Sequence, residues 1–417
     1  MNDNYEVTLK QVIEVIHKTI NFVEKKLLNH GERVAYVMLN LLKADGNYSY
    51  EEILRICAVS TFHDIGAYKV TKKENLSDVD IVSPYNHAVY GSLFIKYFSP
   101  LSDLYKIVLT HHFSPKYYKT RGIDVISKEG LLLNFVDHID RIYFNKKSFP
   151  KKIFEENTSN DFKDNIDLFV KAEKQYNFIS KIFDGSYVNE LYDFFGTKVL
   201  ERGEVIAYSK MLAYSIDFRS ESTVKHTIVV EAISYQIAKL YGLSDKKLTR
   251  IKIAAALHDI GKIGIPVEIL EKPGKLTEEE YETMKSHAII GYNILSGLGI
   301  DDIRDIGTMH HEKLDGMGYP FGLKSEQITK EMRIIAIADI VSALIGSRSY
   351  KDVFDKEKII KILTDMVKYN KIDEEMTNLF IDNYDYLIEE ANNECSELMN
   401  TYLNIKEEYK DIMERFS

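Results

Sequence analysis

The pattern of hydrophobic and polar positions predicts helices along nearly the whole chain. In segment 277–295, TEEEYETMKSHAIIGYNIL, Thr277 and Glu280 have the spacing of a helix capping box. Apolar residues then recur near the helical period at Tyr281, Met284, Ala288 and Leu295. No sustained alternation of apolar and polar residues suggests a sheet, and only seven prolines interrupt the 417 residues. The pattern therefore predicts an all-α protein.

An ordered set of motifs occurs twice in the chain. Each half has a His, a His-Asp-Ile-Gly tetrapeptide, a His-x-x-x-Gly step, a His-His pair and, after a hydrophobic run, an Asp. The members are His30, His63, Asp64, His87, His111, His112 and Asp137 in the first half, and His226, His258, Asp259, His287, His310, His311 and Asp339 in the second. The first intervals are 33 and 32 residues, and the later His-to-pair intervals are 24 and 23. This agreement indicates a duplicated domain rather than a solenoid.

The duplication predicts two tandem helical domains joined by a helical connector. We place the first domain at residues 1–145 and the second at 206–390. Residues 146–205 contain few Pro or Gly residues and no motif, which favours a helical connector over a flexible linker. Residues 391–417 have the pattern of an amphipathic helix, which could be a charged surface helix, a packing element or the contact of a homodimer.

Ten of the twelve histidines belong to the repeated set, and this concentration predicts metal binding. A lone His-Asp pair on a helix is usually polar surface, but seven ordered residues present twice are not explained that way. Imidazole and carboxylate groups suit first-row divalent metals such as Fe, Mn or Zn. Seven ligands exceed what one ion usually takes from protein, so the second half is expected to hold two ions bridged by Asp259. The complete set in the first half predicts a further metal site there.

Composition narrows the range of functions. The net charge of −10 disfavours binding to duplex nucleic acid, although a metal cluster can still attract a small anionic substrate. The sequence contains no run of about 18 uncharged apolar residues, so it predicts no membrane span. The N-terminus lacks the pattern of a secretory signal. Cys57 and Cys395 are the only cysteines and lie far apart in sequence, which fits a reducing cytoplasm.

Several separated motifs in the second half resemble the HD-GYP subgroup of the HD phosphohydrolases. They are HDIGKIGIP (258–266), KPGKLTEEE (272–280), HHEKLDGMGYP (310–320) and RIIAIADIVSALIGSRSYK (333–351). The resemblance covers residues 222–390 and implies an all-helical fold with a two- or three-metal site, often iron or manganese. It also implies hydrolysis of cyclic di-GMP, or of 3',3'-cyclic GMP-AMP, by a metal-activated hydroxide that attacks phosphorus.

The resemblance also assigns roles to individual residues. The seven residues of the second-half set match the family's metal ligands, and Lys262 would contact the substrate phosphate or the attacking hydroxide beside Asp259. The remaining substrate-binding positions are Gly318, Tyr319, Pro320, Arg348 and Lys351. Ser222 stands where three-metal members carry a Glu, so two ions are favoured and the product is either linear pGpG or GMP.

The first half keeps the ligand set but departs from the family's other elements. Ala67 replaces the lysine of the signature, and no GYP segment follows the His-His pair. We therefore expect a degenerate HD domain, which is a sensor, a packing partner or a second active site. For the whole chain, the alternatives are a catalytically silent cyclic-dinucleotide receptor, a nucleotidase acting on dNTPs or guanosine tetraphosphate, and a diiron oxygenase.

Overall fold

The computed structural model describes residues 6–23, 29–67, 85–113, 127–144, 162–218, 220–346 and 354–416. Within these ranges the chain is helical, and the only strand-like pairings are two isolated bridges, Thr8 with Val199 and Asp315 with Lys324. The all-α prediction is confirmed. None of the described helices combines the length and the apolar character that a membrane crossing requires. The chain divides into two compact units, one of residues 1–204 with 409–417 and the other of residues 205–408.

The first unit begins with α1 (Leu9–Val23), α2 (His30–Asp45) and α3 (Tyr50–Thr61). It continues with α6 (Tyr85–Phe98), η2 (Ser102–Leu104), α7 (Tyr105–Leu109), α9 (Lys128–Ile139) and the π-helix η3 (Asp140–Phe144). Three further helices complete it, α11 (Lys163–Tyr176), α12 (Phe178–Asp184) and α13 (Tyr187–Gly196).

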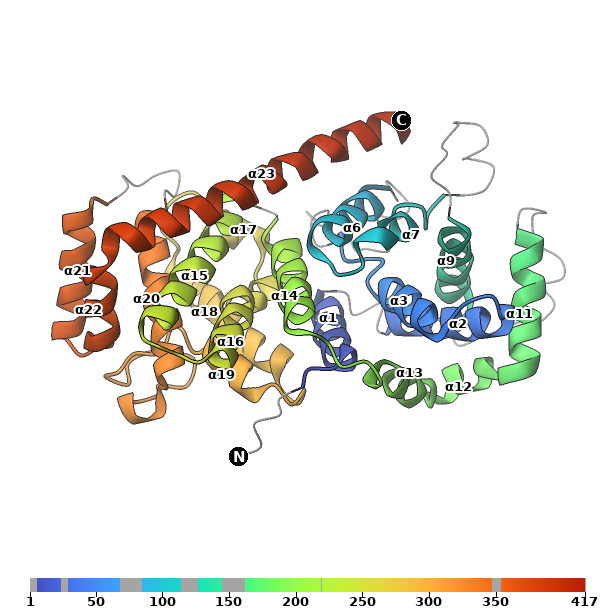
Figure 1. The fold of residues 1–417 in the computed structure, drawn as a ribbon, viewed down its shortest axis with the longest axis horizontal. Helices are drawn as coiled ribbons and strands as arrows, with labels where there is room; N and C mark the ends of the chain where they lie inside the picture. The colour runs from blue at the N-terminus through green and yellow to red at the C-terminus, as the bar shows by residue number, and fades with distance from the viewer. Residues whose placement is uncertain are drawn as a thin grey trace. The chain divides into compact units, whose positions relative to one another are not determined.

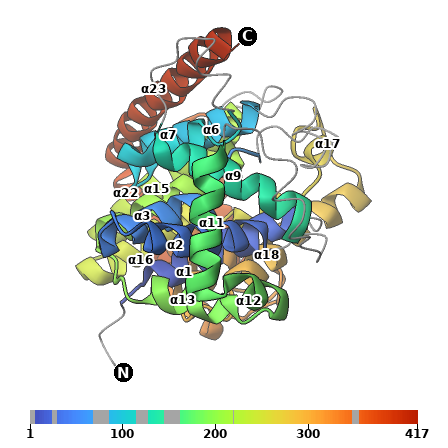
Figure 2. The ribbon, with the colours of Figure 1, turned by 90° about the vertical axis from the view of Figure 1, so that its right-hand side faces the viewer.

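Helix α2 is the centre of the first unit, because twelve of its sixteen residues are buried. It packs against α3, α9, α11 and α13, and Figure 2 shows α11 running across it. The hydroxyl of Tyr36 on α2 donates to Glu190 on α13 at 2.6 Å, and the ring of Tyr36 lies 5.5 Å from that of Tyr187. The described part of the expected connector therefore packs on the first unit's core. The domain boundaries themselves stay a prediction.

The second unit contains α14 (Arg202–Asp217), α15 (Glu221–Leu240), α16 (Asp245–Leu257), η5 (Ile260–Gly264) and α17 (Val267–Leu270). It continues with α18 (Glu278–Leu295), α19 (Asp301–Thr308), η6 (Ser325–Gln327), α20 (Lys330–Ile345), α21 (Lys356–Lys368), α22 (Glu374–Asp382) and α23 (Tyr384–Phe416), of which the residues up to 408 belong to this unit. Helix α15 packs against both α16 and α20, and α18 packs against η5 and α19 (Figure 1). The capping box predicted for α18 is present, with Thr277 and Glu280 bonded to each other's backbone. Tyr281, expected on its apolar face, is instead 50% exposed.

The last helix, α23, begins seven residues before the segment expected from sequence. Its side chains Leu387, Ala391, Tyr402 and Ile405 are buried. The ring of Tyr402 lies 4.3 Å from that of Phe218, at the end of α14. Packing thus accounts for these four positions of its first six turns, whereas Tyr386 and Leu403 are exposed, and a homodimer stays a prediction.

A close backbone approach explains the glycine of both His-Asp-Ile-Gly motifs. A Cβ atom on Gly261 would lie 1.9 Å from the carbonyl oxygen of His287 and 2.5 Å from the amide nitrogen of Gly291. In the first unit, a Cβ on Gly66 would meet the equivalent atoms of His87 and Gly91 at 2.1 and 2.3 Å. Only glycine allows the motif to lie against the helix that carries the third histidine.

Substituting Gly261 with alanine should therefore destabilise the second unit by about 3 kcal/mol or more, because backbone atoms cannot rotate away from the added methyl. Thermal unfolding followed by circular dichroism measures the effect. Gly203→Ala in α14, where a Cβ meets no atom within 4 Å, should change stability by less than about 1 kcal/mol. Equal effects of the two substitutions would contradict the argument.

A buried ion pair ties α20 to α22. Asp373 caps α22 by accepting from the amide of Met376 at 2.9 Å, and Nη1 of Arg333 donates to it at 2.6 Å. Arg333 also donates to the carbonyls of Ser325 and Ile328. Burial raises the pKa of Asp373, but the amide of Met376 and the charges of Arg333 and Lys330 outweigh burial and lower it below 3.8.

A depressed pKa contributes stability that is present above the unfolded value and is lost as the pH falls through the folded value. Asp373→Asn should lower the free energy of unfolding by about 1–3 kcal/mol at neutral pH, and the difference from wild type should shrink as the pH falls below the ordinary pKa of an aspartate. Urea unfolding of both proteins across a series of acidic pH values checks this. Asp385→Asn, in an exposed pair with Lys356, is the matched control and should change stability by less than about 1 kcal/mol.

Candidate metal centres

The second unit brings all seven predicted ligands together from different helices. His226 lies in the second turn of α15, His258 and Asp259 follow α16, and His287 lies within α18. The pair His310-His311 follows α19, and Asp339 lies in α20. Their ligand atoms form two groups, each within 4.8 Å, namely His226 with His258 and Asp259, and His287 with His310 and His311.

Asp259 lies between the two groups and offers one oxygen to each. Its Oδ2 is 3.0 Å from Nε2 of His258 and 3.5 Å from Nε2 of His226. Its Oδ1 is 3.4 Å from Nε2 of His287 and 4.0 Å from Nε2 of His310. Oxygens divided in this way would allow the carboxylate to bridge two ions, and the bridging role expected from the ligand count stays a prediction.

Asp339 also reaches both groups. Its Oδ1 is 3.3 Å from Nε2 of His226, and its Oδ2 is 3.8 Å from Nδ1 of His311. The two groups therefore share two carboxylates.

Backbone carbonyls orient three of the imidazoles. The Nδ1–H groups of His258, His287 and His310 donate to carbonyls three residues earlier in the chain, at 2.6–2.7 Å. His226 is held differently, since its Nδ1 lies 3.0 Å from the hydroxyl of Ser342, which itself donates to the carbonyl of His226. A neutral ring held in this way through its Nδ1–H keeps a free lone pair on Nε2, which is the state a metal requires.

The electrostatics of the centre favour bound positive charge. Burial lowers the pKa of His311 to about 3 and also lowers those of His287 and His310, so these rings are neutral at pH 7. Burial also opposes the charged form of His226, but hydrogen bonds to Asp259 and Asp339 outweigh it and raise its pKa to about 9. A positive charge on His226 is thus stabilised between the carboxylates of Asp259 and Asp339. The neutral imidazoles of His287, His310 and His311 beside two carboxylates fit divalent ions.

Lys262, predicted as a catalytic residue, is part of the centre. Its Nζ donates to Oδ2 of Asp259. Burial lowers the pKa of Lys262, but the negative charge of Asp259 outweighs burial and raises it, so the ammonium group stays charged. The side chain therefore supplies one fixed positive charge beside the bridging carboxylate.

The GYP segment, which contains Gly318, Tyr319 and Pro320, lies beside His311. The ring of Tyr319 is 4.6 Å from that of His311, and its amide donates to the carbonyl of His311 at 3.3 Å. Glu312, a buried residue that the sequence did not single out, accepts from the amides of Phe321 at 2.6 Å and Leu323 at 2.8 Å. Its carboxylate folds the segment of Gly318, Tyr319 and Pro320 back towards the centre. The sequence feature that could have pointed to Glu312 is its place directly after the His-His pair.

Two predicted substrate-binding residues, Arg348 and Lys351, lie outside the described residues. Another acidic residue near Lys262 was not predicted from the sequence. Asp217, at the end of α14, is buried, accepts from the hydroxyl of Thr227 at 2.6 Å and lines a small cavity with Lys262. Burial raises its pKa to about 6. No sequence pattern distinguishes this Asp from surface acids.

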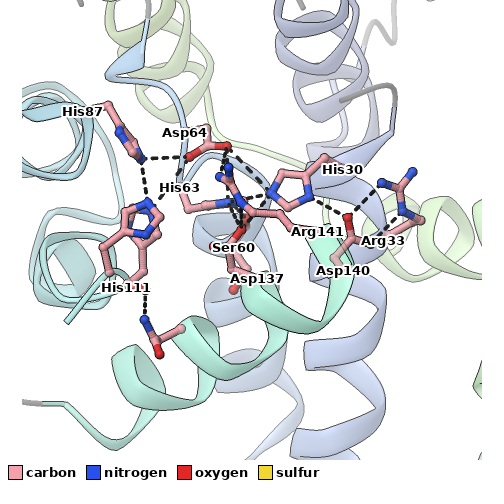
Figure 3. A network of polar contacts seen from close by, with 12 residues as sticks. His30, Arg33, Ser60, His63, Asp64, His87, His111, Asp137, Asp140 and Arg141 are labelled. Carbon is pink, nitrogen blue, oxygen red and sulfur yellow. Dashed lines mark hydrogen bonds and ion pairs between the residues drawn. The ribbon is translucent and has the colours of Figure 1, made fainter. Parts of the chain in front are cut away.

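The first unit holds a second centre with the same plan (Figure 3). Oδ1 of Asp64 is 3.3 Å from Nε2 of His87 and 3.8 Å from that of His111, whereas Oδ2 is 3.5 Å from Nε2 of His63 and 3.7 Å from that of His30. The two groups of ligand atoms are His30 with His63 and Asp64, and Asp64 with His87, His111 and His112. The last predicted ligand of this set, Asp137, lies 2.9 Å from His30.

Comparisons with known proteins confirm the resemblance to the HD-GYP group. Residues 209–376 match the model of the HD domain family. A 3'3'-cGAMP-specific phosphodiesterase 1 of Vibrio cholerae is 26% identical over 408 residues, which are 92% of this chain and 93% of that protein. A cyclic di-GMP phosphodiesterase of Thermotoga maritima is 44% identical over 152 residues. That match spans 36% of this chain and 40% of the relative.

A solved structure supports the fold of the whole chain. The crystal structure of a cyclic GMP-AMP specific phosphodiesterase of V. cholerae superposes with a TM-score of 0.57 at 17% identity. The alignment covers 91% of this chain and 98% of that one. At this level of identity the likeness concerns the fold alone.

Removing the Glu312 carboxylate should release the GYP segment. In Glu312→Ala, the amides of Phe321 and Leu323 lose a charged acceptor that contributes about 1.5–3 kcal/mol per bond. We expect their hydrogen exchange to accelerate by roughly 10-fold or more. Glu326→Ala, at an exposed position of the same segment, should leave both rates unchanged. Protection that persists in Glu312→Ala would show that other contacts hold the segment.

Proposed function

We propose that the second unit, which resembles the HD-GYP group and matches the HD domain family over residues 209–376, is a metal-dependent phosphodiesterase that hydrolyses a cyclic dinucleotide. The division of the Asp259 oxygens between two groups of histidines carries the proposal. It is the arrangement expected for two ions that act on one phosphoryl group. When bound, the ions would activate a water and neutralise charge on the phosphoryl oxygens.

The residues of the chain would position the substrate and balance its charge. Lys262 places an ammonium group beside the bridging carboxylate, on the side of His226 and His258. There it would attract a phosphodiester oxygen and favour the extra negative charge of the transition state. The imidazoles of His287 and His310 stay neutral and are oriented by their carbonyl partners, so these rings need no reorganisation when the substrate arrives.

Aromatic and basic side chains near the GYP segment would bind the rest of the nucleotide. The ammonium of Lys285 lies 5.3 Å from the ring centre of Tyr281 and 5.9 Å from that of Tyr319. Met317 and Phe321 of the same segment are exposed. Exposed aromatic rings beside a cation suit a ligand that carries both bases and phosphates. Arg348 and Lys351 are proposed as further phosphate contacts on the resemblance alone.

Two cyclic dinucleotides are candidates for the substrate. Cyclic di-GMP is favoured by the motifs of the second unit and by its similarity to a cyclic di-GMP phosphodiesterase. 3',3'-cyclic GMP-AMP is favoured by the relative that matches nearly the whole chain. A receptor without activity would show the same binding, so turnover has to be measured directly. A nucleotidase is less well supported, because the GYP segment and Lys262 have no role in that proposal.

The test is hydrolysis by the full chain purified without oxygen and loaded with Fe(II) or Mn(II). Cyclic di-GMP and 3',3'-cyclic GMP-AMP are supplied separately, and the products are resolved by chromatography. We expect loss of at least one substrate, with linear dinucleotide or mononucleotide as the product, and no loss after treatment with a chelator. The two substrates compared at equal concentration establish the base preference.

Variants assign the activity to one centre. Asp259→Asn should lower the rate by about 100-fold or more, because one ligand oxygen and the bridging charge are lost. Asp64→Asn, the same change in the first unit, should keep most of the activity. Activity that survives Asp259→Asn and disappears in Asp64→Asn would contradict the proposal and assign the reaction to the first unit. Tight binding without product would support the receptor.

A further inference from the structure

The two centres differ in the group behind their first histidine. In the second unit, Nδ1 of His226 lies against the hydroxyl of Ser342 at 3.0 Å. In the first unit, Nδ1 of His30 lies 2.6 Å from Oδ2 of Asp140. Asp140 follows the ligand Asp137 by three residues, as Ser342 follows the ligand Asp339. A carboxylate has thus replaced a hydroxyl at the same place of the repeat.

Asp140 is fixed by an arginine on the same helix as His30. Nε of Arg33 donates to Oδ1 of Asp140 at 2.6 Å, and Nη2 donates to Oδ2 at 2.8 Å. Figure 3 shows Arg33, Asp140 and His30 as a continuous chain that ends at Asp64. The bidentate pair holds the carboxylate in one orientation and compensates its buried charge.

A carboxylate behind a metal-binding imidazole makes that imidazole a stronger ligand. It accepts the Nδ1–H, fixes the ring and increases the electron density at Nε2. Loss of such a partner typically lowers metal affinity by about 10–100-fold. The first centre has this support at His30, and the second has only a hydroxyl at the corresponding position.

The first centre is also more closed. The side chains of His30 and Asp137 are 4% and 5% exposed, whereas those of His226 and Asp339 are 19% and 13% exposed. Closed metal sites are typically structural, and sites that keep an open position are typically catalytic.

Arg141 takes the place that Lys262 has in the second unit. Its Nε donates to Oδ1 of Asp137 at 2.8 Å, and its Nη2 lies 3.4 Å from Oδ2 of Asp64. The inner charges of the two centres are therefore equal, with two carboxylates and one basic side chain in each, although Ala67 replaced the lysine. In the first centre the positive charge comes from Arg141 in η3, and not from a lysine that follows the His-Asp-Ile-Gly motif.

Two buried atoms of the first centre indicate that a ligand belongs there. Oδ1 of Asp64 and Nε2 of His111 are inaccessible to solvent and have no hydrogen-bond partner among the described residues. Both atoms face the group formed with His87 and His112. Nε2 of His87 lies 3.3 Å from Oδ1 of Asp64, within ion-pair distance, but forms no hydrogen bond with it. A buried carboxylate oxygen without a hydrogen bond is costly, and a divalent cation would satisfy both atoms at once.

We infer that the first unit holds a first-row divalent metal ion in a closed, slowly exchanging site that stabilises this unit, whereas the metal of the second unit exchanges readily. The Arg33–Asp140–His30 chain produces the difference. This inference concerns metal retention and stands apart from the proposed activity, which depends on the second centre.

The test is release of Zn(II) from the full chain into an excess of a chromogenic chelator. Zn(II) serves as the probe because it has no redox chemistry and accepts imidazole and carboxylate ligands. We expect a fast and a slow phase. His258→Ala should remove the fast phase, and His63→Ala should remove the slow one.

Exchanging Asp140 and Ser342, the residues behind the first histidine of each centre, should reverse the difference in the rate of Zn(II) release. Asp140→Ser should accelerate the slow phase by about 10–100-fold and leave the fast phase unchanged, and Ser342→Asp should slow the fast phase. Asp140→Asn keeps the size of the side chain and covers the case in which Asp140→Ser fails to fold.

Three outcomes would overturn the inference. They are a slow phase that persists in His63→Ala, release in a single fast phase, and a slow phase unchanged in both Asp140 variants. The first would place the retained metal in the second unit, and the third would remove Asp140 as the cause.

Discussion

The structure depends on the convergence of histidines and aspartates from separate helices on one buried carboxylate, Asp259 in the second unit and Asp64 in the first. Buried carboxylates and imidazoles are tolerated only when they satisfy one another or a metal. The helices that carry them must therefore meet within a few ångströms. This requirement explains why α15, α16, α18 and α20 pack around one point, and why Gly261 and Gly66 allow no side chain where the motif meets the third helix.

The same scaffold supports two different centres because the changes lie behind the ligands. The ligand set and the sharing of one carboxylate between two histidine groups are the same in both units. Differences begin with the groups that hold His30 and His226, and with the source of the positive charge, Arg141 or Lys262. An open centre with a flanking GYP segment suits turnover, and a closed centre with a carboxylate-supported histidine suits retention of a metal. On the proposals made above, duplication would allow one unit to stabilise and the other to react.

Much of the fold and of the ligand set could be predicted from the sequence, because both are periodic or local. Helical spacing predicted the all-α fold, and the repeated motifs predicted which fourteen residues converge. Most of the supporting residues could not be predicted. Glu312 is marked only by its place directly after the His-His pair, whereas Asp217 and Asp140 contact a hydroxyl, an imidazole or a guanidinium, and such contacts leave no repeat. The pair of Arg33 and Asp140 joins residues 107 positions apart, and only the folded chain brings them together. Tyr281 fits the apolar period of its helix yet is exposed, because periodicity does not show where the packed face ends.

The central claim is that Asp259 bridges two ions at the reactive centre. Electron paramagnetic resonance of the full chain loaded with Mn(II) tests it most directly, because a bridging carboxylate couples the spins of neighbouring ions. A variant with His63→Ala and Asp64→Asn removes the contribution of the first unit. The account predicts an exchange-coupled two-manganese signal in that variant, which is lost when Asp259 is also replaced by Asn. Signals of isolated ions only, at full metal loading, would contradict it.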